Sequence, residues 1–296
     1  RIIALKGVGG YNFVCSPFQE TAVKNLRRLK IREEKPFAVM FRDMDQIRRY
    51  CYVSPEEETL LSSSAKPIVL LERRIAPPEG SREAGDRGEI CEEVCKTSRF
   101  VGAFLPSMGV QFMLIDRCGP LIVTSANLSD MPIIKDDEEM FLLQDSLAKE
   151  ATVEGVGQRK MDGPEDRQVE TLAAVFYNTR KIRVRLDDSV ARVIDGQPQM
   201  IRRSKGYAPV PLYINNKLTK QDMILATGGQ LKASFSLSKG PFAYVSQYFG
   251  DLDSVEAETI FADNVARMQE LFRIRPALIV SDLHPLYFTT RYAAQY

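Results

Sequence analysis

Short apolar runs recur along the 296-residue chain, each four or five residues long, rich in β-branched side chains and bounded by turn-forming residues. Runs of this kind predict β-strands. Helical patterns lie between the early runs: Thr21–Lys30 has its apolar side chains on one side, and Ser54, Pro55 and Glu57 have the spacing of a capping box. This alternation predicts an α/β fold with an open, twisted mixed sheet and flanking helices. The predicted strands are Ile2–Leu5, Phe37–Phe41, Ile68–Leu71, Leu121–Thr124, Ala174–Tyr177 and Val190–Ile194.

Interruptions of this pattern predict loops and a domain boundary. Ala76–Lys96 and Glu150–Glu170 are rich in glycine, proline and charge without apolar periodicity, and are predicted to be surface loops. Prolines and asparagines interrupt the pattern again at Pro209–Gln221. We therefore predict two domains, residues 1–210 and 211–296.

The second domain begins with a different order of elements. Ser254–Phe272 predicts an amphipathic helix whose apolar stripe faces a core, and Phe288–Tyr296 predicts the opening of another helix. The predicted strands are Met223–Thr227, Ala243–Gln247 and Ala277–Ser281. The order strand, glycine turn, strand, helix, strand resembles the opening of an actin-like (ASKHA) α/β domain. We expect this domain to be partial, and both ends of the chain to be cut from a longer polypeptide.

Charge and cysteine content limit the environment and partners of the chain. Forty basic and thirty-nine acidic residues leave a net charge of +1, so any anion site must be local. The five cysteines are scattered, and no signal-peptide pattern precedes them, which favours a cytoplasmic protein. No apolar run approaches the length of a transmembrane helix, so no membrane association is expected.

Two clusters in the first 40 residues could bind anions. Lys6–Tyr11 follows the first strand, and three glycines in four residues permit positive φ and a close approach of backbone N–H groups to phosphate. Taken separately, such a pattern more often marks a tight turn. Lys30, Arg32 and Lys35 form the second cluster. In an extended segment residues 30 and 32 project to the same side, although basic residues at a helix end also simply complement its dipole.

Two further clusters lie later in the first domain. Thr124–Ser129 ends an apolar strand, where small hydroxyl and amide groups can bind phosphate or ribose; an ordinary capped turn would look the same. Asp187–Val190 and Arg202–Tyr207 flank a hairpin predicted at Asp195-Gly196. This hairpin would bring Ser189 close to the arginine pair.

In this order, the four clusters resemble the YrdC family, whose open α/β domain binds ATP, and most closely the YrdC-like domain of the HypF carbamoyltransferases. The matching segments are Lys6–Tyr11, Lys30 and Arg32 with Lys35–Met40, Thr124–Ser129, Asp187–Val190 and Arg202–Ala208. The remainder resembles the start of the next HypF domain, an actin-like TsaD-type module, through Gly228–Lys232, Ser246–Leu252 and Asp282–Pro285.

The resemblance implies an ATP-dependent carbamoyltransferase. Such an enzyme forms carbamoyl adenylate from ATP, with Mg²⁺ carried by the nucleotide, and from carbamoyl phosphate or carbamate. It passes the carbamoyl group to a cysteine thiol of a HypE-like acceptor protein during nickel-iron hydrogenase maturation. Catalysis would consist of positioning and electrostatic stabilisation. The implied catalytic residues are Lys6, Lys30, Arg32, Ser125 and Asn127, and the implied nucleotide-binding residues are Lys35, Thr124, Ser189, Arg202, Arg203, Gly228, Gly229 and Lys232.

Several positions depart from the family pattern. Asp130 stands where a glycine usually follows the Ser-Ala-Asn motif, and Asn178-Thr179 replaces a frequent His-Asn. In the second module, Gln230, Ala233 and Tyr248 stand for an expected Glu, Asn and His. These departures weaken the expectation of activity more for the second module than for the first.

No metal site other than that of Mg²⁺ with ATP is predicted. His284 is the only histidine, and Cys91 and Cys95 have no second pair to complete a zinc set.

Two alternative functions stay open. One is a threonylcarbamoyl-adenylate synthase of the tRNA-modifying branch of the YrdC family. The other is a nucleotide- or RNA-binding module without catalysis. A net charge of +1 and the lack of tryptophan give RNA binding little support, so nucleic acid is not an expected partner.

Overall fold

The computed structural model describes residues 1–74, 88–127, 131–154, 172–214 and 223–296. They form two compact units, each with its own sheet and hydrophobic core. The first unit comprises residues 1–129, 133–186 and 190–199, and the second comprises 130–132, 187–189 and 200–296. Residues 215–221 of the predicted boundary lie outside the described residues, and the division into domains at residue 210 stays a prediction.

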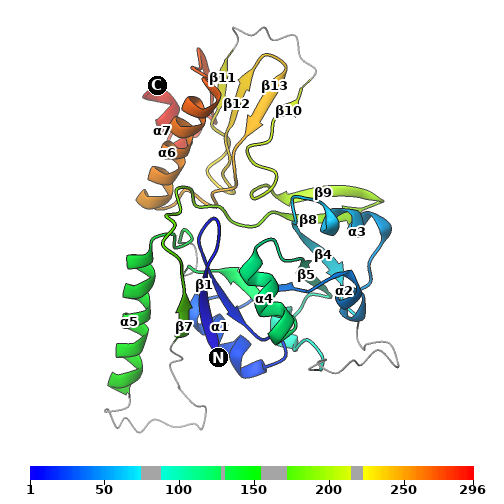
Figure 1. Ribbon diagram of the computed structural model, residues 1–296. Helices are drawn as coiled ribbons and strands as arrows, with labels where there is room; N and C mark the ends of the chain where they lie inside the picture. Colours follow the sequence, from blue (N-terminus) through cyan, green and yellow to red (C-terminus); the bar gives the residue numbers. More distant parts are fainter. Residues whose placement is uncertain (75–87, 128–130, 155–171, 215–222) are drawn as a thin grey trace. The chain divides into compact units, whose positions relative to one another are not determined.

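The larger sheet is mixed and has nine strands among the described residues, in the order β7-β1-β2-β6-β3-β5-β4-β8-β9 (Figure 1). The pairs β1·β7, β3·β5 and β4·β8 are parallel, whereas β6 runs antiparallel to both β2 and β3. The strands are β1 (Ile2–Lys6), β2 (Tyr11–Cys15), β3 (Ala38–Met40), β4 (Ile68–Glu72), β5 (Phe100–Phe104), β6 (Leu121–Ser125), β7 (Leu172–Phe176), β8 (Val190–Ile194) and β9 (Gln197–Arg202).

Both faces of the central strands are buried. Successive side chains of a strand point to opposite faces, so neighbouring residues such as Val39 and Met40 enter different core clusters. One cluster packs against α1, α2 and α3, and the other contains Ile115 of α4. Burial on both faces explains why these strands read as continuous apolar runs. The helical elements are α1 (Glu20–Lys30), α2 (Met44–Tyr50), α3 (Pro55–Ser62), the 3₁₀ turn η1 (Glu92–Val94), α4 (Gly109–Cys118) and α5 (Asp137–Glu154).

The second unit contains a five-stranded sheet in the order β10-β13-β12-β11-β14. β11, β12 and β13 pair antiparallel, and β14 returns parallel to β11 after the long helix α6. Phe261, Val265 and Met268 of α6 are buried in the core of this unit, as their spacing predicts. The elements are β10 (Leu212–Tyr213), β11 (Ile224–Ala226), β12 (Ser236–Lys239), β13 (Phe242–Val245), α6 (Val255–Phe272), β14 (Leu278–Val280) and α7 (Phe288–Ala294).

The predicted mixed α/β fold is confirmed, with two corrections to the predicted loops. Ile90, Val94 and Cys95 are buried in the core, so the end of the Ala76–Lys96 segment is not a surface loop. The start of Glu150–Glu170 is also not a loop, since α5 continues to Glu154. Both predictions rested on the polar local composition. Tertiary packing overrides it in the first segment, and continuation of helix α5 overrides it in the second. Residues 75–87 and 155–171 lie outside the described residues.

No described helix combines the length and apolar character needed to cross a bilayer. The five cysteines all lie within the described ranges, and none of them is joined in a disulfide.

We expect Phe261→Ala to lower the free energy of unfolding of the second unit by roughly 3–5 kcal/mol, because it empties the centre of an aromatic cluster. Leu271→Ala on the exposed side of the same helix is the matched control. Urea unfolding followed by circular dichroism measures both. Equal effects of the two substitutions would contradict the assigned orientation of α6.

Candidate functional site

Lys30 is the centre of a buried polar cluster. It is the last residue of α1, it is only 3% exposed, and its ammonium lies 5.7 Å from the centre of the Phe13 ring. The ammonium donates hydrogen bonds to the carbonyl of Ser125, to the carbonyl of Asn127 at 3.2 Å and to Asn127 Oδ1 at 2.7 Å. Ser125 Oγ donates to the same Oδ1 at 2.8 Å. These oxygens fix the position and orientation of the ammonium.

The cluster stands at the carboxyl end of β6. Ser125 is the last residue of that strand and pairs with Asn12 of β2, so the start of β2 lies at the same edge of the sheet. Strand ends of open α/β sheets are where ligands commonly bind. The structure therefore brings together Lys30, Ser125 and Asn127, which the sequence placed in two separate clusters. Thr124 lies in the same strand, whereas Leu128, Ser129 and Asp130 lie outside the described residues.

The predicted extended geometry of residues 30–32 is wrong. Lys30 is still helical, and Ile31 takes the left-handed conformation with φ 52° and ψ 50°. Arg32 consequently turns away from Lys30: its guanidinium donates to the carbonyl of Lys35 at 3.0 Å and to that of Pro36, and lies 4.7 Å from the Phe37 ring centre. The helix ends at Lys30, as its apolar pattern predicted, and the left-handed Ile31 then changes the direction of the chain.

Lys6 is held by a carboxylate that the sequence analysis missed. Its ammonium lies 2.5 Å from Asp137 Oδ1, donates to the carbonyl of Asn178 at 2.8 Å, and is 4% exposed as a residue. The Tyr11 hydroxyl donates to the same oxygen of Asp137 at 2.6 Å. Asp137 stands in the first turn of α5, where a carboxylate also complements the helix dipole. The run of four acidic residues at 136–139 was the available signal.

The two ionisable partners of this network are shifted in opposite directions. Partial burial would raise the pKa of Asp137, but hydrogen bonds from Lys6 and Tyr11 and the charge of Lys6 hold that pKa below its usual value. Burial and the neighbouring Asp137 carboxylate raise the pKa of Tyr11 well above its usual value. Both shifts keep Asp137 a carboxylate and Tyr11 a neutral phenol at neutral pH.

The glycines of the Lys6–Tyr11 turn are required by close packing. A Cβ at Gly9 would stand 2.1 Å from the carbonyl oxygen of Leu186, and one at Gly10 would stand 2.5 Å from the side chain of Ile133. None of Gly7, Gly9 and Gly10 has a positive φ, so the expectation of positive φ in this turn is wrong. Backbone bonds from Tyr11 to Ile134 and from Leu186 to Gly9 fix the turn.

The predicted β8–β9 hairpin is present, and Asp195 and Gly196 have the positive φ values of its tight turn. In the second unit, Ser189 Oγ accepts from the Ser204 N–H at 2.8 Å and donates to the carbonyl of Lys205 at 2.9 Å. Ser189 thus lies beside the segment that carries the arginine pair.

The two arginines of that segment have different environments. Arg202 pairs with Asp187 at 2.5 Å and stacks 5.2 Å from the Tyr248 ring centre. Arg203 donates to the carbonyls of Tyr207 and Val210, and its Nε is buried without a hydrogen-bond partner. Lys205 pairs with Asp188. The arginines are therefore held in place by protein groups and do not extend freely into solvent.

The glycine turn after β11 has the positive φ expected of a tight loop. Gly228 has φ 69°, and a Cβ there would stand 2.0 Å from the carbonyl oxygen of Ser234. The Lys232 N–H, which could face a phosphate, donates to Asp251 Oδ1 at 2.7 Å. A Cβ at Gly229 would lie 3.7 Å from Asp282 Oδ2. Carboxylates thus lie near two of the three residues predicted for this loop, Gly229 and Lys232.

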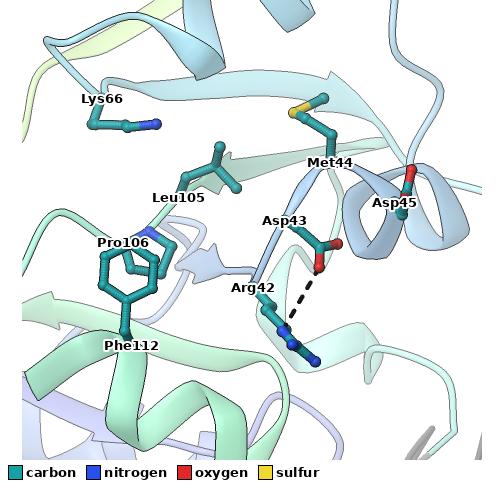
Figure 2. A pocket seen from close by; sticks show the side chains of 8 residues that line it. All are labelled: Arg42, Asp43, Met44, Asp45, Lys66, Leu105, Pro106 and Phe112. Carbon is teal, nitrogen blue, oxygen red and sulfur yellow. Dashed lines mark ion pairs between the residues drawn. The ribbon is translucent and has the colours of Figure 1, made fainter. Parts of the chain in front are cut away.

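A separate cavity of about 370 Å³ opens in the first unit (Figure 2). Lys66, Leu105, Pro106 and Phe112 line one part of it, and the start of α2 lines the rest. It lies where the parallel strands β3 and β5 end, whereas β6 is antiparallel to β3, so the Lys30 cluster stands at the opposite edge of the sheet. The cavity contains none of the predicted site residues, and we keep the buried polar cluster as the candidate site.

The fold and this site define a class of protein: a YrdC-like domain, with a lysine buried at the end of a central strand, and a Kae1-like segment after it in the chain. The family model described as "telomere recombination" (Sua5, YciO and YrdC) matches residues 1–150, which is half of the 296 residues. The chain belongs to the Sua5–YciO–YrdC family. Residues 219–296 match the model of the HypF Kae1-like domain.

Within this family the chain is similar over its whole length to HypF carbamoyltransferases. It is 32% identical to "carbamoyltransferase HypF2" of Cupriavidus necator, covering 100% of this chain and 34% of that protein. A solved structure of full-length HypF in a phosphate- and nucleotide-bound form matches with a TM-score of 0.83 and 33% identity, covering 100% of this chain and 41% of that one. The structure of T. kodakarensis HypF matches with a TM-score of 0.80 and 30% identity, covering 99% of this chain and 34% of that one. The chain thus spans about a third of the length of its curated relatives.

We expect Asp137→Asn to lower the free energy of unfolding at pH 7 but to matter little in acid. The pKa of Asp137 is depressed in the folded state, so its stabilisation is present above the unfolded pKa of about 3.9 and disappears as pH falls through the folded value. Urea unfolding between pH 7 and pH 3 measures the difference from wild type. Asp136→Asn, at the exposed neighbouring position, should leave the pH profile unchanged.

We expect Gly9→Ala to destabilise the first unit and to displace Leu186, because a Cβ would overlap a backbone carbonyl that cannot move independently of its chain. Gly109→Ala is the control, since nothing lies within 4 Å of a Cβ there. Thermal unfolding compares the two. Equal melting temperatures would contradict the close packing described for the turn.

Proposed function

We propose that this chain forms an acyl adenylate, and specifically carbamoyl adenylate, from ATP and carbamate. The observation that carries the proposal is the Lys30 cluster: a buried ammonium fixed by neutral oxygens at the end of β6. A fixed cation of this kind needs no reorganisation when negative charge develops beside it. The similarity to HypF carbamoyltransferases supports carbamate as the acyl group.

The proposed reaction is a displacement at the α-phosphorus of ATP. A carbamate oxygen forms a bond to this phosphorus, the bond to the pyrophosphate oxygen breaks, and pyrophosphate leaves with the bonding electrons. Negative charge builds up on the leaving group, where cations are most effective. Lys30 would bind the phosphates, Ser125 and Asn127 would hold Lys30 in place and contact the nucleotide, and Arg32 and Lys35 would extend the positive region. No side-chain nucleophile is needed.

Lys6 has a supporting role in this proposal. It is bound to Asp137, so its charge is already paired, and it fixes the β1–β2 turn beside α5. In the second unit, Ser189, Arg202 and Arg203 are proposed to bind nucleotide, and Gly228, Gly229 and Lys232 are proposed to form a further phosphate loop.

Mg²⁺ would enter with the ATP phosphates and take its other ligands from water, as it commonly does in nucleotide sites. Asp187 and Asp188 already pair with Arg202 and Lys205, and the described residues bring no three His, Cys, Asp or Glu side chains together as a dedicated cage.

The acceptor of the carbamoyl group would be a cysteine thiol of a HypE-like protein, with carbamoyl phosphate as the source of carbamate. Both assignments rest on the similarity to HypF, of which this chain covers about a third.

We expect ATP–pyrophosphate exchange when carbamate is supplied, either from carbamoyl phosphate or from bicarbonate with ammonium. Lys30→Ala should reduce the exchange rate by about a hundredfold or more, the usual effect of losing one preorganised charge-stabilising group. Lys24→Ala removes an exposed lysine of the same helix and serves as the control. Circular dichroism verifies that both variants are folded.

The outcome distinguishes the alternatives. Exchange that requires threonine with bicarbonate would move the chain to the tRNA-modifying branch of the family. ATP binding without exchange for either substrate would leave a nucleotide-binding module and overturn the proposed reaction.

A further inference from the structure

Arg27 is a buried cation whose position suggests a task beyond packing. It lies one turn before Lys30 on α1, is 6% exposed, and its guanidinium carbon lies 4.9 Å from the Phe37 ring centre. Its Nη1 donates to the carbonyl oxygens of Arg32, Glu33 and Lys35 at 3.1, 3.1 and 3.2 Å. One guanidinium nitrogen therefore gathers three carbonyl oxygens of the loop between α1 and β3.

The other side of the guanidinium reaches a second segment. Nε and Nη2 donate to the carbonyl oxygen of Glu93 at 2.9 and 2.5 Å, and Nε lies 3.3 Å from the Glu93 carboxylate. The Phe37 N–H donates to the neighbouring Val94 carbonyl at 3.0 Å. Arg27 thus joins α1, the loop that carries Arg32 and Lys35, and the η1 turn. Only a planar fork of donors satisfies so many acceptors, and a lysine ammonium has three donors without that geometry.

The loop held in this way contains an unfavourable backbone conformation. Ile31 has φ 52° and ψ 50° although it is β-branched, and its side chain is 68% exposed, so no burial of that side chain compensates. Conformations of this kind persist where the surrounding structure determines them. The residue stands directly between Lys30, which turns inward to Ser125 and Asn127, and Arg32, which turns to Lys35 and Pro36.

We propose that Arg27 is a positioning residue for the nucleotide-phosphate site: its guanidinium holds residues 31–35 in the strained conformation that sends Lys30 and Arg32 in their two directions. The proposal rests on the proposed function of Lys30 and Arg32 as phosphate-binding cations. Arg27 itself does not touch the nucleotide in this proposal and acts only by positioning its neighbours. Loss of the fork lets Ile31 relax to an ordinary backbone conformation and displaces Arg32.

The experiment compares Arg27→Gln and Arg27→Lys with Arg28→Gln, an exposed arginine on the next position of the same helix. Cleavage by a glutamate-specific protease after Glu33 and Glu34 reports the loop independently of any activity. We expect Arg27→Gln to be cut there about tenfold faster than wild type, which corresponds to about 1.4 kcal/mol of lost local stability. Arg28→Gln should match wild type, and Arg27→Lys should resemble Arg27→Gln.

A functional measurement separates positioning from general stability. In the pyrophosphate-exchange assay, Arg27→Gln should raise the KM for ATP about tenfold while kcat changes less than about threefold, since uniform binding of the phosphates is weakened. The double variant Arg27→Gln/Ile31→Gly should have a KM for ATP between those of Arg27→Gln and wild type, because glycine adopts the left-handed conformation without strain.

Two results would overturn the proposal. One is unchanged cleavage after Glu33 and Glu34 in Arg27→Gln; the other is faster cleavage throughout the first unit with a lowered melting temperature, which would show a purely structural role. If wild type itself lacks exchange activity, the proposed function fails. The protease comparison still decides in that case whether Arg27 holds the loop.

Discussion

A buried ammonium group joins the first helix of this protein to the end of a central strand. Lys30 reaches across from α1 to Ser125 and Asn127 of the β6 end, and this contact fixes the helix, the strand end and the start of β2 at one edge of the sheet. Burial of a charge is costly unless hydrogen bonds compensate, and here carbonyl and amide oxygens provide them. The chemistry proposed for the chain depends on this arrangement, because it holds a cation ready before a nucleotide arrives.

Backbone carbonyls bind most of the cations around this site. Arg27, Arg32 and Lys6 each donate to main-chain oxygens, and Arg203 does the same within the second unit. Carbonyl oxygens orient a cation while leaving its net charge in place. The Lys6 ammonium also pairs with the Asp137 carboxylate, and the Arg27 guanidinium with that of Glu93, so two of these cations have a carboxylate partner as well.

The fold was largely predictable, because strands buried on both faces produce continuous apolar runs and amphipathic helices produce periodic ones. The capping box of Ser54 and Glu57 and the hairpin turn at Asp195 and Gly196 were predictable for local reasons. The strands β2, β5, β10 and β12 and the helices α2, α4 and α5 were not predicted. Of these, β5 contains Gly102, where close approach of β3 and β4 leaves no room for a Cβ, and such a glycine weakens the strand signal.

The sequence by itself determined the class of fold, many of its elements, and most of the polar residues of the candidate site, because periodicity and short motifs depend on neighbours in the chain. Only the tertiary structure decided which of these residues meet. It placed Lys30 on Ser125 and Asn127, separated Arg32 from Lys30 through the left-handed Ile31, and revealed Asp137 and Arg27 as the partners that fix Lys6 and the α1–β3 loop. These contacts join residues as far as 131 positions apart in the chain, as in Lys6 and Asp137, and no local pattern encodes such a distance.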